Sequence, residues 1–175
     1  MEEGIILTNL WVWIVLLVII LERTASKRIS TRNERWLIER GGRAPKETHY
    51  RGLLLVQYLA FSSVVVELLY IKQTEVVFNR FFFICCLIVL CCKWWCIRSA
   101  GVFWNTKKIT LPRVRLFKQG PYRYVKNPDY LLTLLEIAFI SVLFGAYITA
   151  FVYPLLYIFF FKLTQSEAQK VYKNA

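Results

Sequence analysis

The chain has 175 residues, of which 57% are hydrophobic and 17% aromatic, and its formal net charge is +12. Charged residues make up 19%, below the near quarter that is usual in a soluble domain, and they are segregated from the apolar stretches. This composition excludes an ordinary soluble domain and indicates an integral membrane protein with one domain, residues 1–175. The positive charge does not indicate nucleic-acid binding, because the cations lie in short segments beside apolar stretches and no nucleic-acid-binding signature is present.

Four apolar stretches follow one another along the chain and predict five membrane-spanning helices. Each of the first three is close to the roughly 20 residues that one span needs. The fourth, Leu131–Phe161, is too long for one span and has Gly145 near its middle, so it predicts a tight helical hairpin. The predicted fold is therefore an all-α integral membrane protein. Its predicted spans are 4–21, 52–71, 76–97, 131–144 and 147–163.

Two basic segments, 22–51 and 98–130, connect these spans and predict the orientation of the chain. The first holds nine Lys and Arg residues and predicts a short interfacial helix at Arg28–Glu39. Nine more cations lie between Lys93 and Asp129, whereas the connection Lys72–Arg80 has two. Because cytoplasmic loops carry the excess of Lys and Arg, both segments and the C-terminus are predicted in the cytoplasm, with the N-terminus outside.

Five cysteines all fall in the third span, which excludes an extracellular disulfide framework. His49 is the single histidine, and no Cys-x-x-Cys pair occurs. Packing of small polarizable side chains is therefore favoured over a soft-metal site, and no metal is predicted. The cysteines are Cys85, Cys86, Cys91, Cys92 and Cys96.

Two acidic residues lie inside predicted spans, where an ionisable side chain is rare and costly. Glu136 follows the start of the fourth span, so it is a candidate catalytic residue facing an entrance cavity. An equally weighted interpretation is a hydrogen bond to a neighbouring tyrosine or tryptophan that holds helices together. Glu67 lies near the outer end of the second span and is expected to extend towards the membrane surface.

The segment between Gly120 and Tyr130 reads Gly-Pro-Tyr-Arg-Tyr-Val-Lys-Asn-Pro-Asp-Tyr and comes directly before the fourth apolar stretch. Its two prolines prevent a continuous helix, because each removes a backbone donor and restricts the residue before it. Three tyrosines and several polar groups are thus held on irregular backbone at the predicted membrane surface. This arrangement indicates a binding site rather than a plain anchor.

That segment resembles the Gly-Pro-Tyr-Arg-Tyr-Val-Arg-His-Pro-x-Tyr signature of the isoprenylcysteine carboxyl methyltransferase family. Trp104–Pro112 is similar to the approach segment of that family, and Leu131–Phe161 with Glu136 resembles its closing hairpin. Arg32–Leu37, with Arg40-Gly41-Gly42 and His49-Tyr50, resembles the first loop of a small bacterial branch, some of whose members O-methylate alkylpyrones. The resemblance extends from about Arg28 to Tyr172.

The resemblance implies an S-adenosylmethionine-dependent O-methyltransferase with a cytoplasmic cofactor-binding loop before the hairpin and S-adenosylhomocysteine as product. The implied acceptor is lipophilic, either a prenylcysteine-type carboxylate or an alkylpyrone-type hydroxyl, and the implied setting is a multi-pass position in a bacterial plasma membrane. Glu167 matches a family glutamate near the acceptor and joins Glu136 as a catalytic candidate. The implied cofactor-binding residues are Leu116, Phe117, Tyr122, Asn127, Pro128, Asp129 and Tyr130.

Three positions depart from the family pattern. Asn127 stands where the family usually has histidine, and Leu163 stands where it has an arginine four residues before Glu167. Ala168 stands where the family has a second glutamate. The departures predict either a changed acceptor, which is the favoured interpretation, or a lost activity. Two alternatives to an enzyme therefore stay open: a catalytically silent relative that binds cofactor or lipid, and a structural or transport membrane protein. Membrane lipids and a lipophilic or lipidated substrate are the predicted partners.

Overall fold

The computed structural model describes residues 10–42, 47–68, 79–107, 109, 111, 119–125 and 127–173, with backbone alone for 47–50 and 165–173. The described residues form five α-helices and two short 3-10 helices, and they contain no strand, which confirms the predicted all-α class. The helices are α2 (Leu10–Glu39), α3 (Glu47–Val66), α4 (Arg80–Ala100), α5 (Pro128–Leu143) and α6 (Tyr147–Lys173), with η2 (Gly101–Phe103) and η3 (Gly120–Arg123) between α4 and α5.

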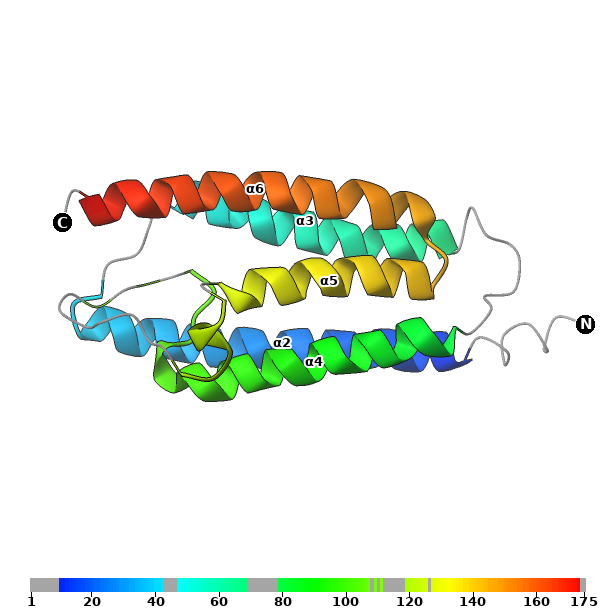
Figure 1. The fold of residues 1–175 in the computed structure, drawn as a ribbon, viewed down its shortest axis with the longest axis horizontal. Helices are drawn as coiled ribbons and strands as arrows, with labels where there is room; N and C mark the ends of the chain where they lie inside the picture. Colours follow the sequence, from blue (N-terminus) through cyan, green and yellow to red (C-terminus); the bar gives the residue numbers. More distant parts are fainter. Residues whose placement is uncertain are drawn as a thin grey trace, which may run out of the picture.

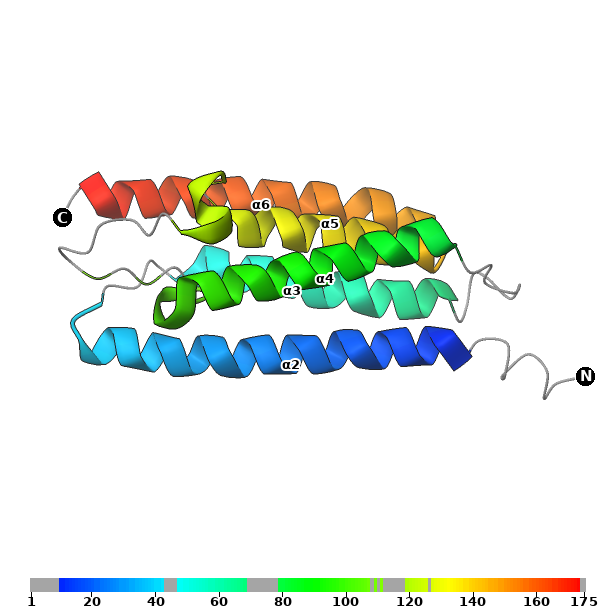
Figure 2. The ribbon, with the colours of Figure 1, turned by 60° about the horizontal axis from the view of Figure 1, so that its bottom comes forward.

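The five helices lie along one common long axis, with α5 between two pairs. Figure 1 shows α3 and α6 on one side of α5 and α2 with α4 on the other. Figure 2 shows α2 at the edge of the bundle, set apart from the other helices. The C-terminal ends of α2 and α6 and the 3-10 helix η3 lie at the same end of the molecule (Figure 1).

Two helical segments are long and apolar enough to cross a membrane: Arg80–Phe103 and Tyr147–Thr164. In the most apolar 18 residues of each segment, only 28% and 11% of the residues are buried in the protein, so most of these side chains face outwards. Exposed apolar surface of this extent needs a non-aqueous surrounding, which indicates a membrane protein. Arg51–Val66 is a shorter apolar helix. The five membrane crossings stay a prediction.

Helix α2 corrects the predicted boundary of the first span. The sequence predicted a span ending at residue 21 and a separate interfacial helix at Arg28–Glu39, whereas the structure has one continuous helix of 30 residues. No glycine or proline interrupts α2. Its first charged residues, Glu22 and Arg23, form ion pairs within the bundle, so the charge does not end the helix. Residues 4–9 of the predicted span lie outside the described residues.

The chain turns sharply between α5 and α6. The amide of Ala146 donates to the Ser141 carbonyl at 2.7 Å, and the amide of Gly145 donates to the Val142 carbonyl at 2.9 Å. These two bonds form a Schellman motif, which requires a left-handed residue at its turn. Gly145 has φ of 68° and meets that requirement without strain. The turn brings α6 back along α5 as an antiparallel neighbour.

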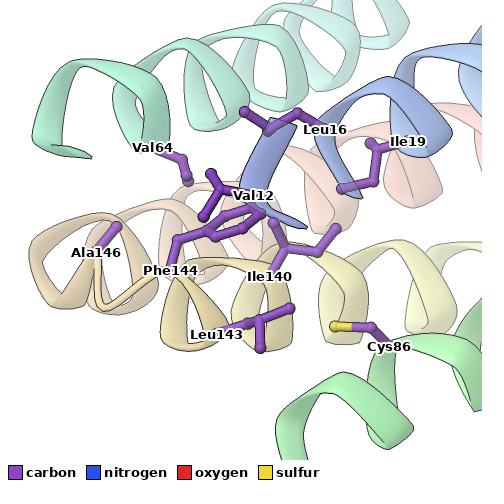
Figure 3. Close-up of a cluster of buried hydrophobic side chains, with 9 residues drawn as sticks. All are labelled: Val12, Leu16, Ile19, Val64, Cys86, Ile140, Leu143, Phe144 and Ala146. Atoms are coloured by element: carbon purple, nitrogen blue, oxygen red, sulfur yellow. The ribbon is translucent and has the colours of Figure 1, made fainter. Parts of the chain in front are cut away.

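Apolar side chains join the helices in two clusters. The first connects α2, α3, α4 and α5 near the N-terminal end of α2 (Figure 3). In it, Val12 and Leu16 lie against Val64, Ile140 and Phe144. The second cluster lies between α3, α5 and α6. It contains Leu53, Val56, Ala60, Ile137 and Tyr157.

The Glu67 side chain turns into the bundle instead of extending outwards, which corrects that expectation. Its side chain is buried, with 6% exposed, and its carboxylate lies at the start of α6. It accepts from the amides of Ile148 and Thr149 at 3.3 and 3.2 Å, and from the Thr149 hydroxyl at 2.9 Å. The first amides of a helix have no partner within the helix and carry partial positive charge, so an acid there is stabilising. Glu67 therefore ties the end of α3 to the start of α6.

This contact predicts a loss of stability when the carboxylate is removed. Glu67→Ala should lower the free energy of unfolding by about 1–3 kcal/mol, because the two buried donors of Thr149 and the part-buried amide of Ile148 lose their acceptor. Glu67→Gln should lower it less, since the amide keeps one acceptor oxygen. Thermal melts in detergent measure the effect, with exposed Glu39→Ala as the control. Equal melting temperatures for Glu67→Ala and Glu39→Ala would contradict the capping role.

Candidate functional site

The segment that resembles a family signature forms a compact connection at the end of α4 and α5. Gly120–Arg123 is one turn of 3-10 helix, and Pro128 begins α5. Gly120 has φ of 55°, and a side chain there would collide with Ser99 of α4. A glycine is therefore required for η3 to approach α4 this closely.

Asp129 joins three separate parts of this connection. Its Oδ1 accepts from the Trp104 indole at 3.0 Å, and its Oδ2 accepts from the Tyr122 hydroxyl at 2.8 Å. Trp104 is buried and follows η2, Tyr122 lies in η3, and Asp129 lies in the first turn of α5. A carboxylate in the first turn is also favoured by the helix dipole. We call Trp104, Tyr122 and Asp129 the aspartate clasp.

The clasp keeps Tyr122 in its neutral form. Burial, and then the charge of Asp129 and the hydrogen bond to it, raise the pKa of the Tyr122 hydroxyl well above its ordinary value. Tyr122 therefore acts as a hydrogen-bond donor to Asp129 and not as a base or an anion. Its ring packs against the apolar cluster of Ile97, Ala100 and Trp104.

Tyr130 faces a different element. Its ring lies 4.5 Å from that of Phe161 and 6.5 Å from that of Tyr157, centroid to centroid, and both partners belong to α6. Pro128 is buried, and Asn127 is half-buried at the N-cap of α5, where its side chain makes no capping bond. The structure thus brings Tyr122 and Asp129 together and directs Tyr130 towards α6.

Three predicted site residues are not described. Leu116 and Phe117 lie outside the described residues, and so does the side chain of Glu167.

The five cysteines are free thiols, and Cys86 and Cys96 are buried. Within the described part of the chain, no cluster of three His, Cys, Asp or Glu side chains is arranged to hold a metal.

The C-terminal half of α2 anchors the segment that leads to the clasp. Asn33 is buried, and its amide nitrogen donates to the carbonyls of Gly101 and Trp104 at 3.0 and 2.8 Å. Glu34 accepts from Ser30 at 2.7 Å. It also forms an ion pair with Lys107 at 3.3 Å. These contacts fix Trp104, and the sequence offered one signal for them, the resemblance of this part of α2 to a family loop.

Glu136 lies at the centre of a buried ion network. Its carboxylate is 1% exposed, and Oε2 accepts from Arg23 Nη2 at 2.6 Å and from Lys93 Nζ at 2.8 Å. Lys93 also pairs with Glu22 at 3.1 Å, and Ser26 donates to Glu22 at 2.8 Å. Two acids and two cations balance, so the network is neutral. The partners of Glu136 are cations and not the predicted tyrosine or tryptophan.

Arg23 extends the network to α3. Its guanidinium lies 5.2 Å from the centre of the Phe61 ring, and the Gln57 amide oxygen accepts from it when that amide is turned towards Arg23. Among the described residues, Glu136 Oε1 and Arg23 Nε make no hydrogen bond, although Arg23 Nε lies 3.7 Å from Glu22 Oε2. Arg23 and Lys93 were counted only among the cations that predict the orientation of the chain, and their pairing with Glu136 was not predicted.

Comparison with known proteins bears on the same part of the chain. Residues 82–172 match the sequence profile of the Isoprenylcysteine carboxyl methyltransferase (ICMT) family. The chain is also 29% identical over 137 residues to the uncharacterized protein YpbQ of Bacillus subtilis (strain 168), which covers 78% of this chain and 82% of that protein. No solved structure matches. The matched region contains the aspartate clasp, Lys93 and Glu136, whereas Arg23 lies before it.

The ion network predicts strong coupling between its members. Lys93→Met should lower the free energy of unfolding by roughly 3–5 kcal/mol, because it leaves buried acid without its cation. The double variant Lys93→Met with Glu136→Gln should lose less stability than the sum of the two single losses, by at least about 1 kcal/mol. Denaturant titration in detergent micelles measures all four proteins. Exposed Arg80→Met with Glu39→Gln is the control pair and should be additive, so additivity at Lys93 and Glu136 would contradict the network.

The aspartate clasp predicts the alkaline behaviour of Tyr122. Because the folded protein holds this proton more tightly than the unfolded chain, stability should fall as the pH rises above about 10. Phenolate absorbance, taken as the difference between wild type and Tyr122→Phe, isolates this residue from the other tyrosines. In an Asp129→Asn background the same difference should appear at lower pH. An unchanged midpoint in that background would show that Asp129 does not act on Tyr122.

Proposed function

The chain belongs to the isoprenylcysteine carboxyl methyltransferase family, whose profile covers residues 82–172, and from this we propose a membrane enzyme that transfers methyl from S-adenosylmethionine to an oxygen of a lipophilic acceptor. The family match confirms the resemblance read from the Gly120–Tyr130 segment. The observation that carries the proposal is that the matched region contains the complete aspartate clasp.

The side chains around the clasp fit S-adenosylmethionine, which combines a flat adenine with a cationic sulfonium. Tyr122 and Tyr130 offer neutral rings, and cation–π attraction to such rings is worth roughly 0.5–2 kcal/mol. Asp129 supplies a negative charge and fixes the Tyr122 ring through its hydroxyl. When bound, the cofactor supplies an electrophilic methyl group and leaves as S-adenosylhomocysteine.

The proposal gives the remaining predicted residues distinct parts. Leu116 and Phe117 line the cofactor pocket, Pro128 begins α5 beneath it, and Asn127 contributes an amide that donates and accepts but carries no charge. Methyl transfer by in-line displacement needs alignment and an acceptor oxygen kept from water more than it needs a metal. Glu167, on α6, lies near the acceptor in this proposal.

Glu136 has a narrower part in this proposal than the predicted catalytic one. Its carboxylate is bound by Arg23 and Lys93 inside the bundle, so we assign it as a positioning residue that holds two cations in place. The outward apolar faces of α4 and α6 give a lipophilic acceptor access from the bilayer. An alkylpyrone-type hydroxyl or a prenylcysteine-type carboxylate is the acceptor, and the cofactor enters from the cytoplasmic side of a bacterial plasma membrane.

A catalytically silent relative is the second candidate, favoured by two particular residues. Asn127 and Leu163 stand where the family usually has histidine and arginine, and neither carries a charge. Such a protein would bind the cofactor or a lipid without transferring methyl.

One pair of measurements tests the proposal. Calorimetry with S-adenosylhomocysteine should show binding, and labelled methyl should pass from S-adenosylmethionine into a lipid extract incubated with the purified protein. Tyr130→Ala should weaken binding about tenfold, because it removes one of the two rings proposed to contact the cofactor. Glu167→Gln should slow transfer and leave binding unchanged.

The neighbouring tyrosine provides the matched control. Tyr124 lies in the same segment but is 79% exposed, so Tyr124→Ala should change neither binding nor transfer. Absence of S-adenosylhomocysteine binding would overturn the proposal. Binding without transfer into any lipid fraction would favour the silent relative.

A further inference from the structure

We propose that the outward face of the C-terminal half of α2 binds the headgroup phosphate of anionic phospholipids. An open hollow of about 690 Å³ lies along this face. Its lining includes four cations and one acid, so its net charge is positive, together with Trp36 and two threonines. The charged residues are Lys27, Arg28, Arg32, Arg35 and Glu39. This inference does not depend on methyl transfer and concerns a surface apart from the aspartate clasp.

The four cations of the hollow differ from those elsewhere in the bundle. Arg23, Lys93 and Lys107 each pair with a glutamate. By contrast, no carboxylate lies within ion-pairing distance of the four cations among the residues that the structure describes. Four positive charges without an acidic partner on one helix face favour binding of an anion that can accept from several donors at once, such as phosphate.

The spacing of these residues places them on one side of α2. Arg28 and Arg32 are one turn apart, about 6 Å along the axis, and Arg35 follows on the same face. The other side of this half is buried through Ser26, Ser30 and Asn33, which contact the rest of the protein. The cations therefore point away from the bundle and not towards the clasp.

The preceding part of α2 identifies a phospholipid as the occupant. From Leu10 to Leu21, a length of about 16 Å, the outward side chains are large, apolar and exposed. That length matches one leaflet of a hydrocarbon core about 30 Å thick. Lys27 and Arg28 follow about 9 Å further along the helix. A surface for acyl chains followed by cations is the order of groups in a phospholipid, and a soluble acidic partner would not need the apolar part.

Trp36 agrees with a position in the headgroup region. The guanidinium of Arg40 lies 3.8 Å from the centre of its ring. An amphipathic indole beside cations is typical of the membrane–water interface. Anionic lipids at that interface attract Lys and Arg near the surface.

Lipid titration of the full-length protein in detergent tests this inference. Dioctanoyl phosphatidylglycerol should raise the melting temperature and remain bound in native mass spectra, whereas dioctanoyl phosphatidylcholine should do neither. Arg28→Gln with Arg32→Gln should weaken phosphatidylglycerol binding roughly 30-fold. Arg28→Lys with Arg32→Lys should keep most of it, because the charge remains.

Arg80→Gln with Arg98→Gln is the matched control, since it removes two exposed cations of α4 that lie outside the hollow. It should bind phosphatidylglycerol like the wild type. An equal effect of phosphatidylcholine, an equal shift with inorganic phosphate, or unchanged binding by Arg28→Gln with Arg32→Gln would each overturn the inference. Far-UV circular dichroism and the melting temperature of the same variants without lipid report folding, which keeps this result separate from the test of methyl transfer.

Discussion

The pairing of two acids with two cations inside the bundle is the interaction on which the rest of the fold depends. Glu136 and Glu22 are buried, and each is within 3.1 Å of Lys93, while Arg23 reaches Glu136 from α2. Each charge alone would be costly in a membrane-embedded interior, and each becomes acceptable only with its partners. The network thereby holds α2, which lies at the edge of the bundle (Figure 2), against α4 and α5.

Helix α5 connects this network to the aspartate clasp. Asp129 and Glu136 are seven residues apart, or about two turns, so they lie on nearly the same side of one rigid helix. At one point α5 is fixed by cations from α2 and α4, and at the other by Trp104 and Tyr122. The position of the candidate cofactor site is therefore set by ion pairs deeper in the bundle. Helix α5 can connect the two places because it lies between the other helices (Figure 1).

Local sequence patterns predicted the features that depend on residues close together in the chain. Apolar length and glycine chemistry indicated an all-α protein with a turn at Gly145, and the Gly120–Tyr130 segment indicated the family. Pairings between distant residues were not predictable in the same way. Glu67 ends as the cap of α6, and α2 continues past Glu22, because partners from other helices satisfy these charges. Lys93 and Glu136, a cation and an acid that each lie inside an apolar stretch, were the visible signs that each needs a partner of opposite charge.

The departures from the family pattern have a physical meaning in this framework. At Leu163 the chain lacks the charge that the family places on its last helix, yet the interior of the bundle holds Arg23 and Lys93. Both cations converge on a single oxygen of Glu136, whose other oxygen has no partner among the described residues. Within the bundle these cations are neutralised by Glu22 and Glu136, so they do not replace the positive charge that is absent at Leu163. In the proposed enzyme, an acceptor that needs no positive charge from α6 would suit this site, so we favour a changed acceptor over a lost activity.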